Sequence, residues 1–208
     1  MVPGKRLIPA SHGQLEAIYR APAAPTTRVG LILHPHPLYG GTMHNPVVFH
    51  CARALHECGF ATLRINFRGV GESSGEHDHG RGEIDDARDA LDALLIEQPS
   101  ATEVVVAGYS FGAAVGLRFG CADDRVHRLV AIGTPIGMSD MSFLGACAKP
   151  KLFAHGDRDD VAPLAALERA WQSDIAPPRQ LEVIAGAGHF FENAMDELRA
   201  AIATFIGS

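Results

Sequence analysis

Short runs of aliphatic and β-branched residues alternate with longer amphipathic stretches along almost the whole chain. The short runs are too apolar to face water on either side, which is typical of strands buried in a parallel sheet. The stretches between them carry apolar residues at helical spacing. The predicted strands are residues 29–33, 61–66, 103–107, 128–132, 151–154 and 180–184. This alternation predicts a parallel sheet with helices on both faces.

A polar N-terminal region precedes the buried strands and predicts a hairpin formed by residues 5–9 and 15–19. The predicted helices are residues 46–58, 81–97, 111–120, 163–174 and 191–206. No internal repeat or long linker interrupts this order. We therefore expect an α/β fold in one domain spanning residues 1–208, with a mostly parallel, twisted sheet of about seven or eight strands.

Two of the predicted helices carry further signals. Asn45 and Pro46 supply a capping side chain and a ring suited to the first helical position, and Gly59 ends that helix. In the helix at 81–97, the apolar stripe consists of Ile84, Ala87, Leu91, Leu94 and Leu95. The opposite side carries acidic residues and is expected to be a solvated face: Glu83, Asp85, Asp86, Asp89 and Asp92.

The composition narrows the class of protein. The chain has 208 residues, is 47% hydrophobic and carries a formal net charge of −6, which suits a globular domain with a sizeable core and excludes a disordered chain. The 18 Lys and Arg residues are scattered, which argues against nucleic-acid binding. Neither a membrane span nor the apolar segment of an export signal is recognisable. We therefore expect a cytoplasmic protein that does not associate with membranes.

The cysteines and histidines do not form a recognisable metal motif. The four cysteines lack paired spacing and are expected to be buried, reduced thiols: Cys51, Cys58, Cys121 and Cys147. Five histidines could be assembled into a ligand set, namely His34, His36, His44, His77 and His79. No carboxylate or thiolate stands at a suitable spacing beside them, so we expect no metal and no cofactor.

The strongest chemical signal is the segment Gly108-Tyr109-Ser110-Phe111-Gly112, which lies between a predicted strand and a predicted helix. A serine in such a sharp strand-to-helix turn has strained backbone geometry, and its neighbours two residues away must be very small. The turn exposes the hydroxyl at a helix N-terminus. This context predicts that Ser110 is a nucleophile, whereas the simpler alternative is a serine that only caps the helix.

A serine hydroxyl becomes a useful nucleophile when a neutral imidazole can accept its proton and a carboxylate orients that imidazole. In the nucleophile-elbow arrangement, the chain order is serine, acid, histidine. His189 lies in a glycine-containing loop after the last predicted strand and is the expected base. His155, which follows an earlier strand, is expected to be structural.

The acid is expected in the loop after the strand at 151–154. Asp159 is the predicted member of the site, with Asp157 and Asp160 as alternatives. Asp157 could instead accept backbone N–H bonds that brace the turn, and Asp160 could cap the helix that begins near Pro163.

Over almost its entire length the chain resembles the α/β-hydrolases. The resemblance rests on the elbow at 108–112, the turn Gly156-x-x-Asp159-x-x-x-Pro163, the Gly188-His189 loop and the turn at 66–73. The segments at 34–43 and 78–83 are similar to a family of small, cap-less bacterial hydrolases and carboxylesterases related to the dienelactone hydrolases. This resemblance implies an α/β-hydrolase fold without a cap domain and a hydrolytic reaction, but leaves the substrate open.

The loop after the first parallel strand is where this superfamily places the second donor of the oxyanion hole. The N–H of Phe111, directly after Ser110, is the first expected donor. Pro35 and Pro37 have no N–H to give, which leaves His36, Leu38 and Tyr39. By similarity to the superfamily's His-Gly-x-Pro turn, the resemblance favours His36, followed by Leu38.

The segment at 133–150 is too short for a folded cap, so we expect a site that is open or covered only by a flap. Side chains that could line an acyl pocket, or equally belong to ordinary packing, are Tyr39, Met138, Phe143 and Phe190.

Together these features predict a serine hydrolase of the carboxylesterase type that cleaves a small-molecule ester through Ser110, His189 and Asp159. A thioesterase, peptidase, dienelactone hydrolase or acyltransferase with the same residues is the alternative within enzymes. A non-catalytic ligand-binding protein on the same fold is the alternative outside them. We expect no nucleic-acid partner, and the assembly state is left open, with a homodimer as one possibility.

Overall fold

A single mixed sheet forms the centre of the protein, whose computed structural model describes residues 4–207. The strands are β1 Gly4–Ala10, β2 Gly13–Arg20, β3 Arg28–Leu33, β4 Ala61–Ile65, β5 Glu103–Tyr109, β6 Arg128–Ile132, β7 Lys151–Gly156 and β8 Arg179–Ile184. They lie in the order β1-β2-β4-β3-β5-β6-β7-β8. Strands β1 and β2 form an antiparallel hairpin, and β2 pairs with β4 in antiparallel orientation. The six strands β4, β3, β5, β6, β7 and β8 are parallel to one another. The predicted mostly parallel sheet is therefore confirmed.

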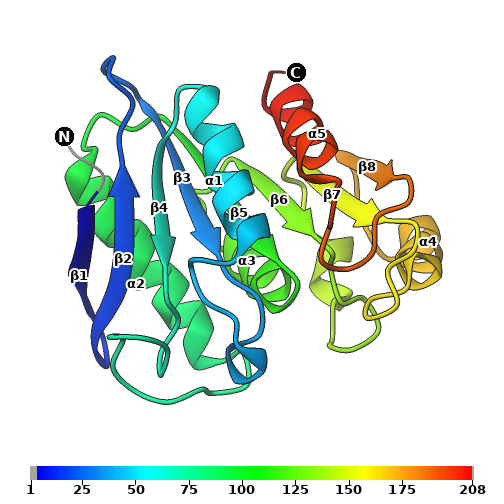
Figure 1. Ribbon diagram of the computed structural model, residues 1–208, viewed down its shortest axis with the longest axis horizontal. Coiled ribbons are helices and arrows are strands. Elements are labelled where there is room, and N and C mark those ends of the chain that lie inside the picture. Colours follow the sequence, from blue (N-terminus) through cyan, green and yellow to red (C-terminus); the bar gives the residue numbers. More distant parts are fainter. Residues whose placement is uncertain (1–3, 208) are drawn as a thin grey trace.

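Helices cover both faces of the sheet (Figure 1). They are α1 Pro46–Glu57, α2 Gly82–Glu97, α3 Phe111–Ala122, α4 Leu164–Ser173 and α5 Met195–Gly207. Apolar side chains of α1 and α5 pack in a core on one face, and those of α2, α3 and α4 pack in a second core on the other. No cap domain is present over residues 4–207, where the connections between strands are single helices or loops. None of the helices in this range is long and apolar enough to span a membrane.

The boundaries of α1 follow the predicted signals. Asn45 Oδ1 accepts a hydrogen bond from the Val47 amide at 2.9 Å, and Pro46 occupies the first turn. Gly59, just beyond the helix, has a positive φ of 88°. The predicted start of the last helix is wrong, because α5 begins at Met195 and not at Phe191. Phe191 and Asn193 have φ values of 53° and 61°, which a right-handed helix does not allow.

The acidic side of α2 is not uniformly solvated as predicted. Glu83 and Asp86 are completely buried. Asp86 accepts two hydrogen bonds from the Arg68 guanidinium, at 3.0 Å from Nε and 2.7 Å from Nη2, and a third from the Arg68 amide. Glu83 accepts bonds from the Asp78 and Gly80 amides. These carboxylates therefore hold the long loop after β4 against the start of α2 through hydrogen bonds, a role that helical spacing alone does not reveal.

The expectation of four buried thiols is also wrong. Cys121, in the last turn of α3, is joined by a disulfide to Cys147, which precedes β7, with the two Cα atoms 5.4 Å apart. Cys51 is a buried free thiol and Cys58 is a half-buried one. The two joined residues are 26 positions apart, and the packing of α3 beside β6 brings them together.

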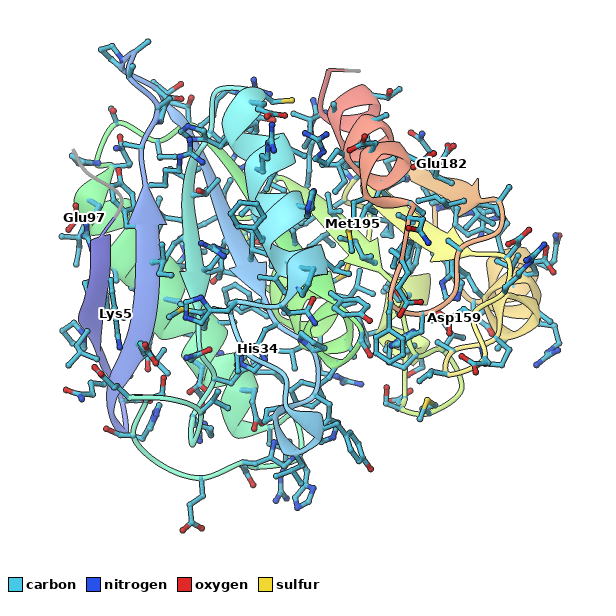
Figure 2. The ribbon with its side chains drawn as sticks, viewed as in Figure 1. Lys5, His34, Glu97, Asp159, Glu182 and Met195 are labelled. Atoms are coloured by element: carbon cyan, nitrogen blue, oxygen red, sulfur yellow. A yellow bond between two sulfur atoms is a disulfide. The ribbon has the colours of Figure 1, made fainter. Side chains whose placement is uncertain are left out.

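The carboxyl ends of the parallel strands meet at one edge of the sheet. Figure 2 shows His34, directly after β3, and Asp159, shortly after β7, at this edge. In open α/β sheets, ligands bind at this edge because the loops that follow the strands converge there. Ser110, Asp159, His189 and His36 lie in these connections, and Phe111 is the first residue of α3.

Candidate active site

Ser110 lies in the turn between β5 and α3, with φ 54° and ψ −118°. A left-handed φ is strained for a serine, and the turn accommodates it because the residues two positions away on either side, Gly108 and Gly112, are glycines. A Cβ at Gly108 would collide with the Gly112 carbonyl, and a Cβ at Gly112 would collide with the His34 carbonyl. The glycines thus let the turn pack against itself and against the end of β3, which places the half-buried Ser110 side chain at the start of α3, where it borders a cavity.

The imidazole of His189 connects this serine to a carboxylate. His189 Nε2 lies 3.0 Å from Ser110 Oγ, and its Nδ1 lies 2.8 Å from Asp159 Oδ2. His189 and Asp159 are both buried, with exposed fractions of 5% and 6%. The structure therefore brings together the three predicted residues from the loops after β5, β7 and β8. With Nδ1 protonated and facing the carboxylate, Nε2 can accept the serine proton.

The loop after β7 holds the Asp159 carboxylate firmly. Its Oδ1 accepts hydrogen bonds from the amides of Val161 at 3.0 Å and Ala162 at 2.7 Å. Burial acts to raise the pKa of Asp159, but the hydrogen bonds from His189 and the Ala162 amide outweigh burial and leave the pKa below its usual value. The carboxyl group is thus ionised at neutral pH, as the orienting partner of an imidazole must be.

The neighbouring groups of this loop have other partners. Asp157 Oδ1 accepts the Gly186 amide at 2.7 Å, so it braces the loop that carries His189. Asp160 is exposed, and α4 begins at its N-cap Pro163 without a side-chain cap, so the suggested capping role of Asp160 is wrong. His155 is buried, and its Nε2 lies 2.6 Å from the Ala162 carbonyl oxygen, in line with a structural role.

The loop after β3 faces the first turn of α3. The His36 ring lies 4.8 Å from the Phe111 ring. The Leu38 amide donates to His36 Nδ1 at 3.3 Å, and the Tyr39 amide donates to the His36 carbonyl at 3.1 Å. Within residues 4–207, the His36 amide itself makes no hydrogen bond. Phe111 is the first residue of α3, so its N–H has no acceptor within the helix.

His34 anchors this loop to the neighbouring one. Its Nε2 accepts a hydrogen bond from the Phe67 amide at 2.9 Å, and its Nδ1 lies 2.6 Å from the Pro35 carbonyl oxygen. Burial lowers the pKa of His34 to about 4, so the ring is neutral and can accept at one nitrogen while donating at the other. It thereby joins the loops after β3 and β4, both of which border the site.

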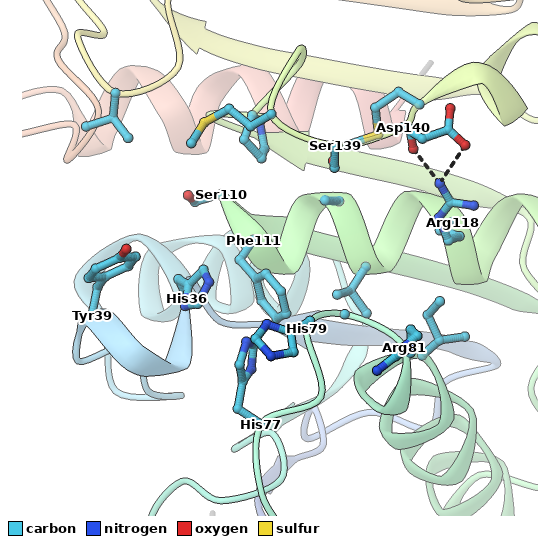
Figure 3. Close-up of a pocket in the computed structure, with 18 residues that line it drawn as sticks. His36, Tyr39, His77, His79, Arg81, Ser110, Phe111, Arg118, Ser139 and Asp140 are labelled. Atoms are coloured by element: carbon cyan, nitrogen blue, oxygen red, sulfur yellow. Dashed lines mark hydrogen bonds and ion pairs between the residues drawn. The ribbon is translucent and has the colours of Figure 1, made fainter.

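A cavity of about 720 Å³ opens beside Ser110 (Figure 3). Ser110, Phe111 and His36 border it together with the start of α2, the exposed side of α3 and residues 135–141. Its volume is in the range usual for small-molecule sites. The short segment between β6 and β7 thus forms one wall of an open cavity.

Two of the four predicted pocket residues border this cavity. Tyr39 and Met138 do so, and both are largely exposed. Phe143 does not, because it packs against the core while the Arg118 guanidinium lies 4.5 Å from its ring centre. Phe190 does not border it either, and is an exposed neighbour of the His189 ring. The expectation is wrong for these two residues.

Sequence reasoning gave no role in the pocket to several residues that border the cavity: His77, His79, Arg81, Ile84, Arg118 and Asp140. Arg118 follows Ser110 by two helical turns, so the helical period could have placed it on the same side of α3. His77 and His79 lie in the irregular loop before α2, where no period exists to place them. Among residues 4–207, no group of three or more His, Cys, Asp or Glu residues is arranged to hold a metal ion.

Comparisons with known proteins agree with this architecture. A family model described as the alpha/beta hydrolase fold matches residues 31–148. An uncharacterised protein of Rickettsia prowazekii is 36% identical over 203 residues, which cover 93% of this chain and 84% of that protein.

Two solved structures are similar over nearly the full length. An alpha-beta serine hydrolase homologue from Coxiella burnetii is 35% identical with a TM-score of 0.92, over 98% of this chain and 97% of that one. A serine hydrolase without a lid from Xanthomonas campestris is 31% identical with a TM-score of 0.90, over 99% of this chain and 94% of that one.

Proposed function

Because the chain belongs to the alpha/beta hydrolase fold family and has serine hydrolase homologues, we propose that it is a serine hydrolase of the carboxylesterase type. One observation carries the proposal: the two hydrogen bonds that link Ser110, His189 and Asp159. The substrate in this proposal is a small-molecule ester whose carbonyl carbon reaches Ser110 from the open cavity. Catalysis then needs only the side chains and backbone of this chain.

In the first half of the reaction, Ser110 Oγ attacks the ester carbonyl carbon while His189 Nε2 takes the hydroxyl proton. The Asp159 carboxylate stabilises the imidazolium that results. The carbonyl oxygen becomes an oxyanion, which accepts hydrogen bonds from the amides of Phe111 and His36. His36 is preferred to Leu38 as the second donor, because the Leu38 amide already donates to the His36 ring.

Acylation is completed when the tetrahedral intermediate collapses and the ester C–O bond breaks. His189 gives its proton to the departing alkoxide, which leaves as the alcohol, and the acyl group remains on Ser110. In deacylation, the second half of the reaction, a water molecule attacks the acyl carbon while His189 removes a proton from that water. That proton returns to Ser110 Oγ as the carboxylic acid leaves, so ester and water yield alcohol and acid.

The proposal is tested by covalent labelling with a fluorophosphonate, which reacts with activated serines, followed by intact mass measurement and peptide mapping. We expect a single adduct on Ser110 in the wild type and none in Ser110→Ala. Ser139→Ala is the matched control, because Ser139 borders the same cavity but contacts neither His189 nor Asp159 in the described structure. This control should be labelled like the wild type.

Turnover of 4-nitrophenyl butyrate by the wild type, lost in Ser110→Ala, completes the test. Thioesters, lactones and peptides assayed in parallel distinguish the esterase from other enzymes with the same three residues. A folded wild-type protein that takes no label and cleaves none of these substrates would overturn the proposal in favour of a ligand-binding role.

A further inference from the structure

The cavity beside Ser110 has two chemically different ends. In Figure 3, Ser110 lies near one end, and Arg81, Arg118 and Asp140 lie near the other. Ser110 and Arg118 are separated by eight positions at the start of α3, which corresponds to about 12 Å along a helix. The cavity therefore extends along α3, away from the nucleophile and toward two guanidinium groups.

The wall between these ends is largely apolar. Ile84 from α2, Ala114 and Val115 from α3, and Met141 from the segment before β7 all border it. Side chains of this kind bury hydrocarbon and offer no hydrogen bond to a polar chain. A methylene chain fits this middle part of the cavity.

Two of the three charged side chains that border the far end of the cavity are cationic. Among the residues that border the cavity, the charged side chains at this end are Arg81, Arg118 and Asp140, in a chain whose formal net charge is −6. Asp78, which pairs with Arg81, lies outside the cavity lining. Guanidinium groups pair well with carboxylates because their planar fork of N–H groups matches two oxygens. An excess of arginine here favours an anionic group on the ligand.

Both guanidinium groups are oriented and still have donors to offer. Arg118 lies over the Phe143 ring, and its Nη2 contacts the carbonyl oxygen of Asp140 and, at 3.5 Å, its carboxylate. Arg81 donates from Nη2 to Asp78 at 2.9 Å. In the described residues, Nε and Nη1 of both arginines make no side-chain hydrogen bond, so a ligand can bind there without displacing the existing partners.

The position of His189 indicates which part of the ester enters this cavity. In the proposed reaction, His189 protonates the leaving alcohol and must lie beside it. His189 does not border the cavity, whereas Ser110 and the two oxyanion donors do. The acyl part of the substrate is therefore the part that extends along α3.

From these observations we propose that the substrate's acyl group is a hydrocarbon chain ending in a carboxylate, so that the substrate is a half-ester of a dicarboxylic acid. Arg118 and Arg81 bind the terminal carboxylate, and the apolar wall binds the methylene chain. This inference rests on the proposed esterase function and adds the class of acyl group.

The test compares pairs of substrates that differ only in the charge at the far end. One member is the 4-nitrophenyl half-ester of succinic, adipic or suberic acid, and the other is the same compound with its free carboxylate methylated. The quantity measured is the ratio of kcat/KM for the anionic member to that for the neutral one, from release of 4-nitrophenol. We expect this ratio to reach about tenfold at the best chain length. The ratio should fall as salt is added, because the Arg118 side chain is partly exposed and the Arg81 side chain is largely exposed.

Variants with opposite expected effects separate recognition of charge from damage to the fold. Arg118→Gln and Arg81→Gln should each lower the ratio about fivefold, since a single charge-assisted pair at a partly exposed site is lost. Asp140→Asn should raise the ratio, because it removes the carboxylate that competes for Arg118. Arg88→Gln is the matched control: Arg88 is an exposed arginine of α2 paired with Asp85, it does not border the cavity, and its loss should leave the ratio unchanged. Circular dichroism checks that each variant is folded.

The outcomes distinguish this inference from the function on which it rests. A ratio near or below one at every chain length, with good turnover of the neutral esters, would overturn the inference and leave the esterase proposal intact. Equal changes of the ratio in Arg118→Gln, Arg81→Gln and Arg88→Gln would also overturn the inference alone. Absence of turnover for both members of every pair, together with absence of fluorophosphonate labelling, would contradict the proposed function itself.

Discussion

At the scale of single residues, the geometry of the candidate site is restricted because most hydrogen-bonding atoms of its side chains already have a partner. Asp159 receives two backbone amides on Oδ1, so its Oδ2 is the oxygen available to His189. The imidazole in turn has one nitrogen on Asp159 and the other near Ser110. A change at any of these atoms therefore alters the protonation or orientation of the next one.

The role of Asp159 is tested by Asp159→Asn, with Asp157→Asn as the matched control in the same loop. We expect Asp159→Asn to fold and to lose about 10⁴-fold in kcat, because the amide favours the imidazole tautomer that cannot accept the Ser110 proton. Asp157→Asn should have a mild effect, since an amide oxygen can still accept the Gly186 N–H. Ester assays on both purified variants decide the matter, and near-wild-type activity of Asp159→Asn would show that another group orients His189.

His34 predicts a pH dependence of stability. Its pKa is lowered by burial to about 4 from 6.5, so below pH 6.5 the unfolded chain binds a proton that the native His34 excludes. The stabilising contribution is complete above pH 6.5 and is lost as the pH falls toward 4. Between pH 7.5 and pH 5, the free energy of unfolding should fall by about 2 kcal/mol because of His34. Urea unfolding of the wild type and His34→Asn at these two pH values measures it. The variant should be less stable at pH 7.5 and lose less on acidification, and equal losses in both proteins would contradict the prediction.

At the scale of secondary-structure elements, the contact between α3 and β3 positions Ser110, the proposed nucleophile. The first turn of α3 packs so closely on the end of β3 that Gly112 lies against the carbonyl oxygens of Leu33 and His34. One turn later, Gly116 faces side-chain atoms of Val106 and Leu33 at 3.3 and 3.4 Å from where a Cβ would lie. Backbone atoms cannot move as readily as side chains, so these two glycines differ in how they tolerate an added methyl group.

This difference predicts unequal effects of the same substitution. Gly112→Ala should push α3 away from β3, destabilise the protein by about 2 kcal/mol or more, and lower kcat by displacing Ser110 and the Phe111 amide. Gly116→Ala should change stability by less than about 1 kcal/mol, since the gain in helix propensity offsets a small adjustment of side chains. Chemical denaturation and ester turnover test both effects, and similar stability of the two variants would show that the close approach is not required.

The predictable part of the fold is the part determined by local pattern. The runs at 29–33 and 129–132 carry no polar side chain, and the strands β3 and β6 lie where the pattern puts them, to within a residue. The start of α5 could not be predicted, because the helical spacing extends into residues whose backbone has positive φ. Glu83 was misplaced for a related reason: its burial depends on backbone amides of a loop that has no sequence period.

The candidate site likewise contains residues that the sequence pattern predicts and residues that it does not. Ser110, Asp159 and His189 could be found because each follows a strand and the parallel topology brings strand ends together. Arg118 lies on α3 and Arg81 is the N-cap residue of α2, but their shared position at the cavity depends on how α2 packs beside α3. The contacts that decide such positions are between elements, and a single sequence carries little information about them.

At the scale of the whole molecule, the sheet separates two apolar cores, and one covalent link crosses between distant parts of the chain. The Cys121–Cys147 disulfide joins the end of α3 to the segment that leads from the cavity wall into β7. Because Ser110 is the N-cap residue of α3, this link connects the helix that follows the proposed nucleophile to the segment between β6 and β7 that borders the cavity. It restricts the unfolded chain by closing a loop between positions 26 residues apart.

Reduction of this disulfide should lower the free energy of unfolding by about 3.5 kcal/mol in the chain-entropy estimate for a loop of this length. Under non-reducing denaturing conditions, alkylation followed by mass measurement should modify only Cys51 and Cys58, and all four cysteines after reduction. Cys121→Ala/Cys147→Ala should match the stability of the reduced wild type. Four alkylated cysteines before reduction of freshly purified protein would show that the bond is not formed.

The left-handed backbone of Ser110 predicts that the proposed nucleophile lowers the thermal stability of the protein. Ser110→Gly removes the Cβ and with it the steric conflict at φ 54°, whereas Ser110→Ala keeps the Cβ and loses only the hydroxyl. Both variants should be inactive, but Ser110→Gly should melt several degrees above Ser110→Ala in scanning calorimetry. Equal melting temperatures would show that the turn is relaxed. A higher melting temperature for Ser110→Gly would mean that selection for stability alone would replace Ser110 with glycine.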